Sequence, residues 1–171
     1  MTYQRPFQTR VVVVVVGVAA LAATVVTPAQ AAIPPAGTIF QISTVLDGRT
    51  MCVSNVKDGT NHAVYPLINC NTSDVTQQWR RTDNGRNIKN VGTGVCIHQS
   101  DLVARGCERE RPSELIWKQD GQGRVWKPYG NSISRTYWAN VNHVAGPRLR
   151  FPHRTNNTIP EDAAVYVFKE I

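Results

Sequence analysis

The residues of this chain best suited to chemistry are four cysteines, four histidines and a group of arginines near its end. The histidines lie far apart, and none has a second histidine or a carboxylate at a spacing typical of a catalytic or metal site. They are His62, His98, His143 and His153. Residues 130–134 (Gly-Asn-Ser-Ile-Ser) lack the last glycine of a nucleophile elbow. The sequence therefore predicts no catalytic residues, and we do not expect an enzyme.

The arginines could serve recognition. Arg148, Arg150 and Arg154, with His153 beside them, could form a basic face for sulfated or uronic-acid polymers or for phosphates. The simpler interpretation is a hydrated face of a strand. No glycine-rich phosphate loop or nucleic-acid motif accompanies these residues, so no nucleic-acid partner is expected.

The cysteines belong to a pattern that recurs along the chain. Cys52-Val53-Ser54 is followed by Cys70 and by Gln77-Gln78-Trp79. A fainter copy runs from Cys96-Ile97-His98 through Cys107 to Leu115-Ile116-Trp117, and a third pass ends at Tyr166-Val167-Phe168. A repeat of roughly 40 to 50 residues predicts an architecture of like units. We place these units at approximately 37–84, 85–122 and 123–171.

Residues 1–31 have the pattern of a secretory signal peptide. Arg5 and Arg10 precede an apolar run at 11–26, and Ala29-Gln30-Ala31 has the small residues of a cleavage site. The run is shorter than the roughly 18 residues that span a bilayer; an uncleaved anchor is the alternative. We expect a secreted, monomeric domain of residues 32–171 without a membrane span.

The charge of the chain is moderately basic. It has 19 Lys and Arg against 12 Asp and Glu, a net charge of +7, and removal of the two arginines in residues 1–31 leaves +5. Such a charge permits attraction to acidic polysaccharides, nucleic acids or anionic surfaces, and it selects none of them.

An exported chain meets an oxidising compartment, so the four cysteines are predicted to form two disulfides. No Cys-x-x-Cys spacing indicates a metal site, and neither a metal nor another cofactor is expected. Three pairings are possible. We favour Cys52–Cys70 with Cys96–Cys107 because each bond closes a short loop inside one repeat.

After Ala32 no long segment has apolar residues at helical spacing, whereas short β-branched or aromatic runs alternate with turn signals such as Asp47-Gly48 and Asp120-Gly121. This pattern predicts an all-β domain with about four short strands in each unit. The expected strands are 39–42, 51–53, 64–67, 79–82, 87–89, 95–97, 102–104, 116–118, 124–127, 137–140, 148–151 and 165–169. Three such units can close into a barrel, which removes exposed sheet edges.

With these residues the chain resembles the ricin-type lectin family, whose β-trefoil fold has three repeats, each with a Gln-x-Trp motif and often an internal disulfide. The first repeat matches best, with Cys52, Cys70 and Gln77-Gln78-Trp79 in the family's order. The resemblance implies a β-trefoil of three pseudo-repeats in which Trp79, Trp117 and Phe168 are core residues. Gln77 would bond the backbone or orient a neighbouring loop.

Sugar binding in this family usually needs an aspartate two residues after the first cysteine, an exposed aromatic residue near the second, and an asparagine just before Gln-x-Trp. No repeat here keeps the full set. The aspartate positions hold Ser54, His98 and Asn140, the asparagine positions hold Thr76, Glu114 and Val165, and the aromatic positions of the first two units hold Ile68 and Arg105.

The third repeat is the best remaining candidate. Asn140 could donate and accept hydrogen bonds there, and Phe151 could be a stacking platform unless alternation with a buried Leu149 places it in the core. In the first repeat, Ser54 and Tyr65 could form a weak cleft beside the Asp58-Gly59 turn.

These expectations favour a secreted module that binds a neutral or acidic carbohydrate without covalent chemistry and keeps only part of the residue set with which the family holds sugars. The alternative is a protein-interaction or inhibitor module on the same β-trefoil scaffold, which the absence of the remaining sugar-binding residues would favour.

Overall fold

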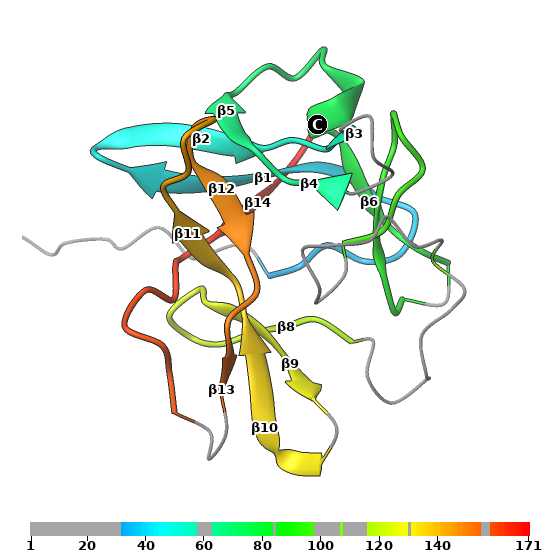
Figure 1. Ribbon diagram of the computed structural model, residues 1–171. Helices are drawn as coiled ribbons and strands as arrows, with labels where there is room; N and C mark the ends of the chain where they lie inside the picture. Colours follow the sequence, from blue (N-terminus) through cyan, green and yellow to red (C-terminus); the bar gives the residue numbers. More distant parts are fainter. Residues whose placement is uncertain are drawn as a thin grey trace, which may run out of the picture.

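The computed structural model describes residues 32–57, 63–83, 85–97, 107, 116–129, 131–154 and 158–171. These residues form short strands and a single turn of 3-10 helix, which confirms the predicted all-β class (Figure 1). The signal peptide expected at residues 1–31 and the strand expected at 102–104 lie outside the described residues. Within these ranges no helix is long and apolar enough to cross a membrane.

The first unit is built on a long hairpin. Its elements are β1 (Ile39–Leu46), β2 (Arg49–Val53), β3 (Val56–Lys57), β4 (Ala63–Val64), β5 (Leu67–Asn69), the 3-10 helix η1 (Val75–Gln77) and β6 (Trp79–Arg81). The turn between β1 and β2 is Asp47-Gly48, with φ angles of 50° and 73°. Two positive φ angles match the twist of a two-residue hairpin turn, which explains the Asp-Gly sequence.

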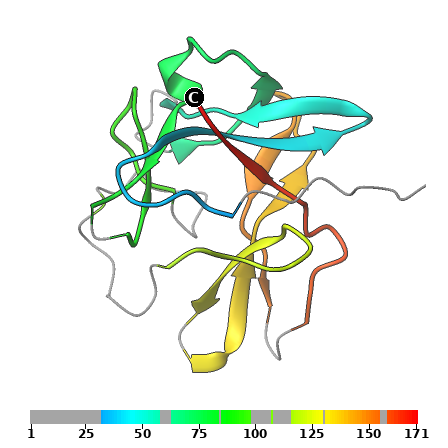
Figure 2. The same cartoon turned by 180° about the vertical axis from the view of Figure 1, so that it is seen from behind.

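The second unit contributes β7 (Ile88–Asn90) and β8 (Lys118–Gln119). The third contains β9 (Val125–Tyr129), β10 (Asn131–Tyr137), β11 (Ala139–Val141), β12 (Arg148–Arg150), β13 (His153–Arg154) and β14 (Val167–Glu170). In both views the β9–β10 hairpin (yellow) points away from the β1–β2 hairpin (cyan) (Figures 1 and 2).

The units are joined through their first and last strands. β6 pairs with β7, β8 with β9, and β14 with β1, each antiparallel. The last strand of each unit therefore bonds the first strand of the next, and the third unit returns to the first; Figure 2 shows β14 (red) beside β1. This cyclic pairing provides hydrogen bonds for the backbone groups of strand edges that three separate units would leave exposed.

Each unit also opens in the same way. Gly37, Gly85 and Gly123 have φ angles of 85°, 67° and 80°. A side chain is unfavourable in this left-handed region, so the three glycines are required at equivalent turns into the first strand of their units.

The repeats share a buried hydrogen bond as well. The indole Nε1 of Trp79 donates to the carbonyl of Val53 at 2.9 Å, and that of Trp117 donates to the carbonyl of Ile97 at 3.4 Å. Val53 and Ile97 each follow the first cysteine of their repeat. The recurrence of one contact at equivalent positions shows that the sequence repeat is a repeat of structure.

The barrel core is largely aromatic. Trp138 lies against Tyr166 and Trp117 in edge-on arrangements, with ring centroids 5.1 and 5.3 Å apart. Phe40 and Phe168, from the paired strands β1 and β14, form another such contact at 5.6 Å. Edge-to-face contacts of this kind add to the free energy of burying the rings.

Some strand boundaries differ from the sequence expectation. The expected strand 64–67 is two strands, because Tyr65 and Pro66 bond elsewhere: the Tyr65 carbonyl accepts from the Leu149 N–H at 2.9 Å. The expected strand 95–97 is reduced to a bridge between Lys89 and Cys96. β10 begins at Asn131, where the local sequence favours a turn. The segment is a strand because it pairs with β9, and this pairing overrides the local propensity.

Candidate functional site

Both disulfides join the cysteines inside one repeat, Cys52 to Cys70 and Cys96 to Cys107. Gln77 holds the chain around Cys70: its Oε1 accepts from the Asn71 N–H at 2.9 Å and its Nε2 donates to the Asn69 carbonyl at 3.1 Å. Since Gln77 is buried, it orients this segment from within the protein and is not available to a ligand.

Polar groups of the first repeat are bonded to one another. Ser54 is fully buried, and its hydroxyl shares a 2.8 Å hydrogen bond with Thr76 Oγ1, which itself donates to Asp74 at 2.7 Å. The hydrogen bonds from the Thr76 hydroxyl and N–H hold the pKa of Asp74 below its usual value. Ser54 and Thr76, two of the three family contact positions of this repeat, are therefore bonded to each other, and the buried Ser54 is not available to a sugar.

Tyr65 and Phe151 are also core residues in the structure. The Tyr65 hydroxyl donates to the Cys96 carbonyl at 2.9 Å, and the ring is 2% exposed. Phe151 packs between Tyr65 and Trp117, with centroids 5.7 and 5.8 Å away. Leu149 is buried with Phe151, as the alternation along the strand anticipates. Neither ring presents a face to solvent for stacking.

Asn140 is different because it is partly exposed and only partly bonded. Its Oδ1 accepts a 2.5 Å hydrogen bond from the hydroxyl of Tyr166. Burial raises the pKa of Tyr166 well above the usual value of a phenol, so this hydroxyl remains a donor. Within the described residues the amide nitrogen of Asn140 has no hydrogen-bond partner, and Tyr166 thus fixes an amide whose two N–H groups are available.

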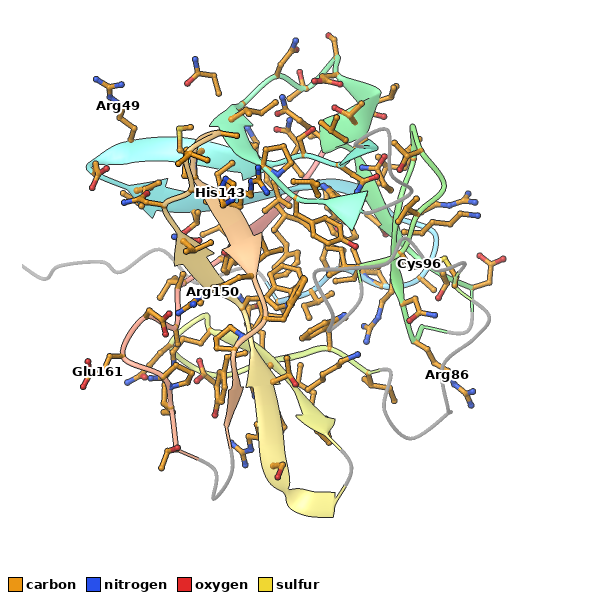
Figure 3. All side chains as sticks on the ribbon, in the orientation of Figure 1. Arg49, Arg86, Cys96, His143, Arg150 and Glu161 are labelled. Carbon is orange, nitrogen blue, oxygen red and sulfur yellow. A yellow bond between two sulfur atoms is a disulfide. The ribbon has the colours of Figure 1, made fainter. Side chains whose placement is uncertain are left out.

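Two charged residues lie on segments that adjoin β11. Ala139 of β11 pairs with Arg150 of β12 and bridges to Ala163, so the segments that carry Asn140, Arg150 and Asp162 meet at Ala139. Asn140 itself is opposite Leu149, so its side chain lies on the other face of the β11–β12 pair from that of Arg150. Arg150 forms an ion pair with Asp162, and their side chains are 40% and 33% exposed. Figure 3 labels Arg150 beside this hairpin. We call Asn140, Arg150 and Asp162 the third-unit cluster.

The third-unit cluster contains amide and guanidinium donors and carboxylate oxygens on adjoining segments. The Nε of Arg150 is buried and has no hydrogen-bond partner among the described groups. Partly exposed polar groups such as the Asn140 amide suit a ligand rich in hydroxyl groups. They do not form a nucleophile with an activating base.

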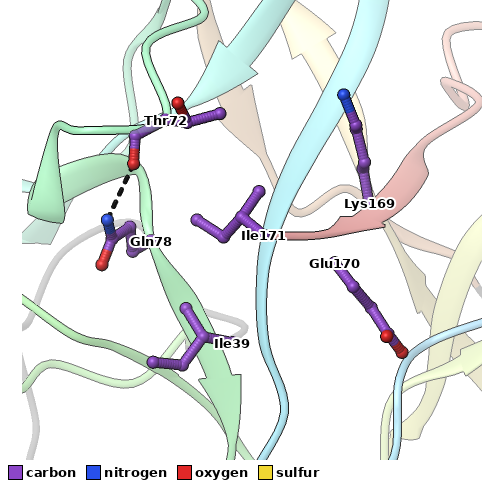
Figure 4. Close-up of a pocket in the computed structure, with 6 residues that line it drawn as sticks. All are labelled: Ile39, Thr72, Gln78, Lys169, Glu170 and Ile171. Atoms are coloured by element: carbon purple, nitrogen blue, oxygen red, sulfur yellow. Dashed lines mark hydrogen bonds between the residues drawn. The ribbon is translucent and has the colours of Figure 1, made fainter.

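A pocket of about 590 Å³ lies elsewhere, at the end of the chain (Figure 4). Its lining residues are Ile39, Thr72, Gln78, Lys169, Glu170 and Ile171. Gln78 Nε2 donates to the Thr72 carbonyl at 2.8 Å, which uses one of the two N–H groups of this amide. These lining residues include none of the positions with which the ricin-type family holds sugars. We therefore prefer the third-unit cluster as the functional site.

Several sequence-predicted positions cannot be placed. His98, Arg105 and Glu114 of the second repeat and the Asp58-Gly59 turn lie outside the described residues. Among the residues that are described, no three His, Cys, Asp or Glu side chains gather as a metal site. Sequence reasoning did not find Asp162, because its contact with Arg150 arises from strand pairing. Tyr166 belongs to the last copy of the repeated pattern, two residues before the core residue Phe168. Its hydroxyl group was the sequence signal that could have indicated a hydrogen bond to a site residue.

No protein-family model and no curated protein matches the chain. Among solved structures, the β-trefoil lectin of the Vibrio vulnificus hemolysin/cytolysin, with N-acetyl-D-lactosamine bound, is similar with a TM-score of 0.53. The two chains are 12% identical, and the similarity covers 78% of this chain and 96% of the other. At this identity the comparison establishes the fold: the chain is a β-trefoil protein. Membership of the ricin-type family remains a prediction from the residues of the first repeat.

Proposed function

We propose that this protein is an exported, non-covalent carbohydrate-binding module whose third unit holds the sugar. The observation that carries the proposal is the Asn140 amide, which Tyr166 fixes through Oδ1 while the N–H groups have no hydrogen-bond partner within the described residues. The Arg150–Asp162 ion pair lies on the adjoining segments. The β-trefoil fold, which this chain shares with the Vibrio vulnificus lectin, supports the same proposal.

The contrast between the first and third units explains why only one of them is proposed. In the first, Ser54 bonds Thr76 and both are withdrawn from solvent to a large degree. In the third, the equivalent position holds Asn140, and Val165 replaces the asparagine that would precede Gln-x-Trp. Val165 cannot bond the Asn140 amide, and among the described residues no other group does, so a sugar hydroxyl can accept from it.

The affinity should be low. The rings of Trp138, Phe151 and Tyr166 are buried, so these described residues give the sugar no stacking surface beside its hydrogen bonds. A small number of exposed hydrogen bonds corresponds to a Kd of about 1 mM, or about −4 kcal/mol.

The test is titration of the purified chain with a panel of neutral and acidic glycans that includes N-acetyl-D-lactosamine, at about 0.05 and 0.5 M NaCl to vary charge screening. Asn140→Ala should weaken binding by about fivefold or more, the value of one lost hydrogen bond, at both salt concentrations. Asn142→Ala is the matched control, because Asn142 is exposed two residues further along. Thermal unfolding of both variants checks that the fold is kept.

Equal affinities for the two variants would refute the role of Asn140. An absence of binding to every glycan would refute the proposal and favour the protein-interaction or inhibitor module instead. Export is tested separately, by N-terminal sequencing of the secreted protein, which should begin at Ala32.

A further inference from the structure

Trp126 differs from the other three tryptophans of the chain. Trp79, Trp117 and Trp138 are at most 3% exposed, whereas Trp126 is partly exposed. It lies on β9, the strand between β8 and β10 in a four-stranded sheet. The indole of Trp126 is therefore the one tryptophan ring of this protein that a dissolved ligand can reach.

Two cations from the flanking strands lie over this ring. The guanidinium carbon of Arg135, on β10, is 4.1 Å from the ring centroid, and Nζ of Lys118, on β8, is 5.2 Å from it. The two charges are therefore within about 9 Å of each other, and each has the geometry of a cation–π contact. Arg154 of β13 is the strand partner of Arg135, so a further basic residue lies beside it in the same sheet.

Neither cation is neutralised by a carboxylate in the described part of the chain. Elsewhere in it, arginines do have such partners: Arg124 pairs with Asp120, and Arg150 with Asp162. The partner that the described residues give Lys118 and Arg135 is the Trp126 ring. Two like charges held close together without a counter-charge create a positive potential that attracts an anion.

We propose that Lys118, Trp126 and Arg135 form a second binding site, which takes the carboxylate or sulfate group of an acidic glycan. The guanidinium and ammonium donate to the anionic group, and the edge of the indole contacts the C–H groups of the sugar ring. A nucleic-acid base would need a free aromatic face for stacking, and here the cations lie over the ring. The chemistry therefore favours an acidic sugar over single-stranded nucleic acid.

This site shares no residue with the third-unit cluster, so either proposal can be refuted without refuting the other. We would titrate the chain with heparin and with polygalacturonate, with dextran as a neutral comparison. Iodide quenching of tryptophan fluorescence, which reports the exposed Trp126, gives a second measurement. Arg135→Gln and Lys118→Gln remove one charge each from the site. Arg49→Gln is the control, because Arg49 is exposed on the distant β1–β2 hairpin and its loss changes the net charge equally (Figure 3).

Each site variant should bind the acidic glycans about fivefold or more weakly, as expected for loss of a well-placed exposed charge pair, while Arg49→Gln changes binding less than twofold. Bound glycan should also protect the wild-type fluorescence from iodide. Equal losses in all three variants would show non-specific attraction and overturn the proposal. Tighter binding of single-stranded DNA than of either acidic glycan would overturn the assignment to a sugar.

Discussion

The buried indole bond of the first repeat can be tested by replacing Trp79 with phenylalanine. Trp79 is fully buried, and its Nε1 donates to the carbonyl of Val53, which is also fully buried. Phenylalanine keeps an aromatic ring in the core but cannot donate this bond, so the Val53 carbonyl loses a partner in a place that water does not reach.

The expected loss has two parts. A buried group left without its hydrogen bond costs about 1–3 kcal/mol. The smaller ring leaves unfilled volume, and at about 0.8 kcal/mol per buried carbon group this adds about 2 kcal/mol. Trp79→Phe should therefore lower the free energy of unfolding by about 3–5 kcal/mol, a large fraction of the 5–15 kcal/mol that stabilises a typical domain.

The assay is urea unfolding followed by far-UV circular dichroism, with Trp126→Phe as the matched control. For a slope of about 2 kcal/mol/M, the midpoint of Trp79→Phe should fall by about 2 M. The control should lose less than about 1 kcal/mol, because Trp126 is partly exposed and phenylalanine retains a cation–π surface. If the two variants lost the same stability, the buried bond from Trp79 to Val53 would be refuted.

Three further predictions concern the rest of the molecule. Replacing both Cys52 and Cys70 by serine should cost about 3 kcal/mol in urea unfolding, because the bond closes a sequence separation of 18 residues; a loss below about 1 kcal/mol would contradict this. Burial raises the pKa of Asp120, but hydrogen bonds to the side chain and N–H of Arg124 outweigh burial and lower the pKa overall. The contribution of the ionised Asp120 carboxylate to the free energy of unfolding is thus fully present above the unfolded pKa of about 3.9. It is lost as the pH falls through the folded pKa. Asp120→Asn should therefore be less stable than wild type at neutral pH, with a difference that shrinks in acid; a pH-independent difference would refute the linkage. Tyr166→Phe should weaken glycan binding about fivefold, since it releases the Asn140 amide; unchanged affinity would show that the amide needs no orientation.

The fold was predictable because its determinants are local and repeated. Two short disulfide loops, an Asp-Gly turn and a tryptophan at the end of each of the first two repeats are visible in the sequence. The glycines that open the three units, Gly37, Gly85 and Gly123, stand at corresponding places in the sequence, and their positive φ angles give the physical reason. β10 was not predictable in this way, because its first residues have poor strand propensity and depend on pairing with β9.

The site was less predictable, because exposure depends on packing between units. The residue types at Ser54 and Tyr65 suit a polar cleft, yet both lie in the interior and bond neighbouring segments. Asn140 was found because it occupies the family's aspartate position in the third unit, whereas the segment of Asp162 joins β11 through a bridge between Ala139 and Ala163 that no local pattern encodes. Trp126 was placed on an expected strand, but the two cations over its ring come from separate strands.

The central claim, that a sugar binds at the third-unit cluster, is tested most directly by NMR titration of the side-chain N–H signals with the best-binding glycan. The account predicts that the amide N–H₂ signals of Asn140 shift and saturate, while the buried indole N–H of Trp79 does not move. Saturable shifts confined to other residues, with the Asn140 signals unchanged, would contradict it.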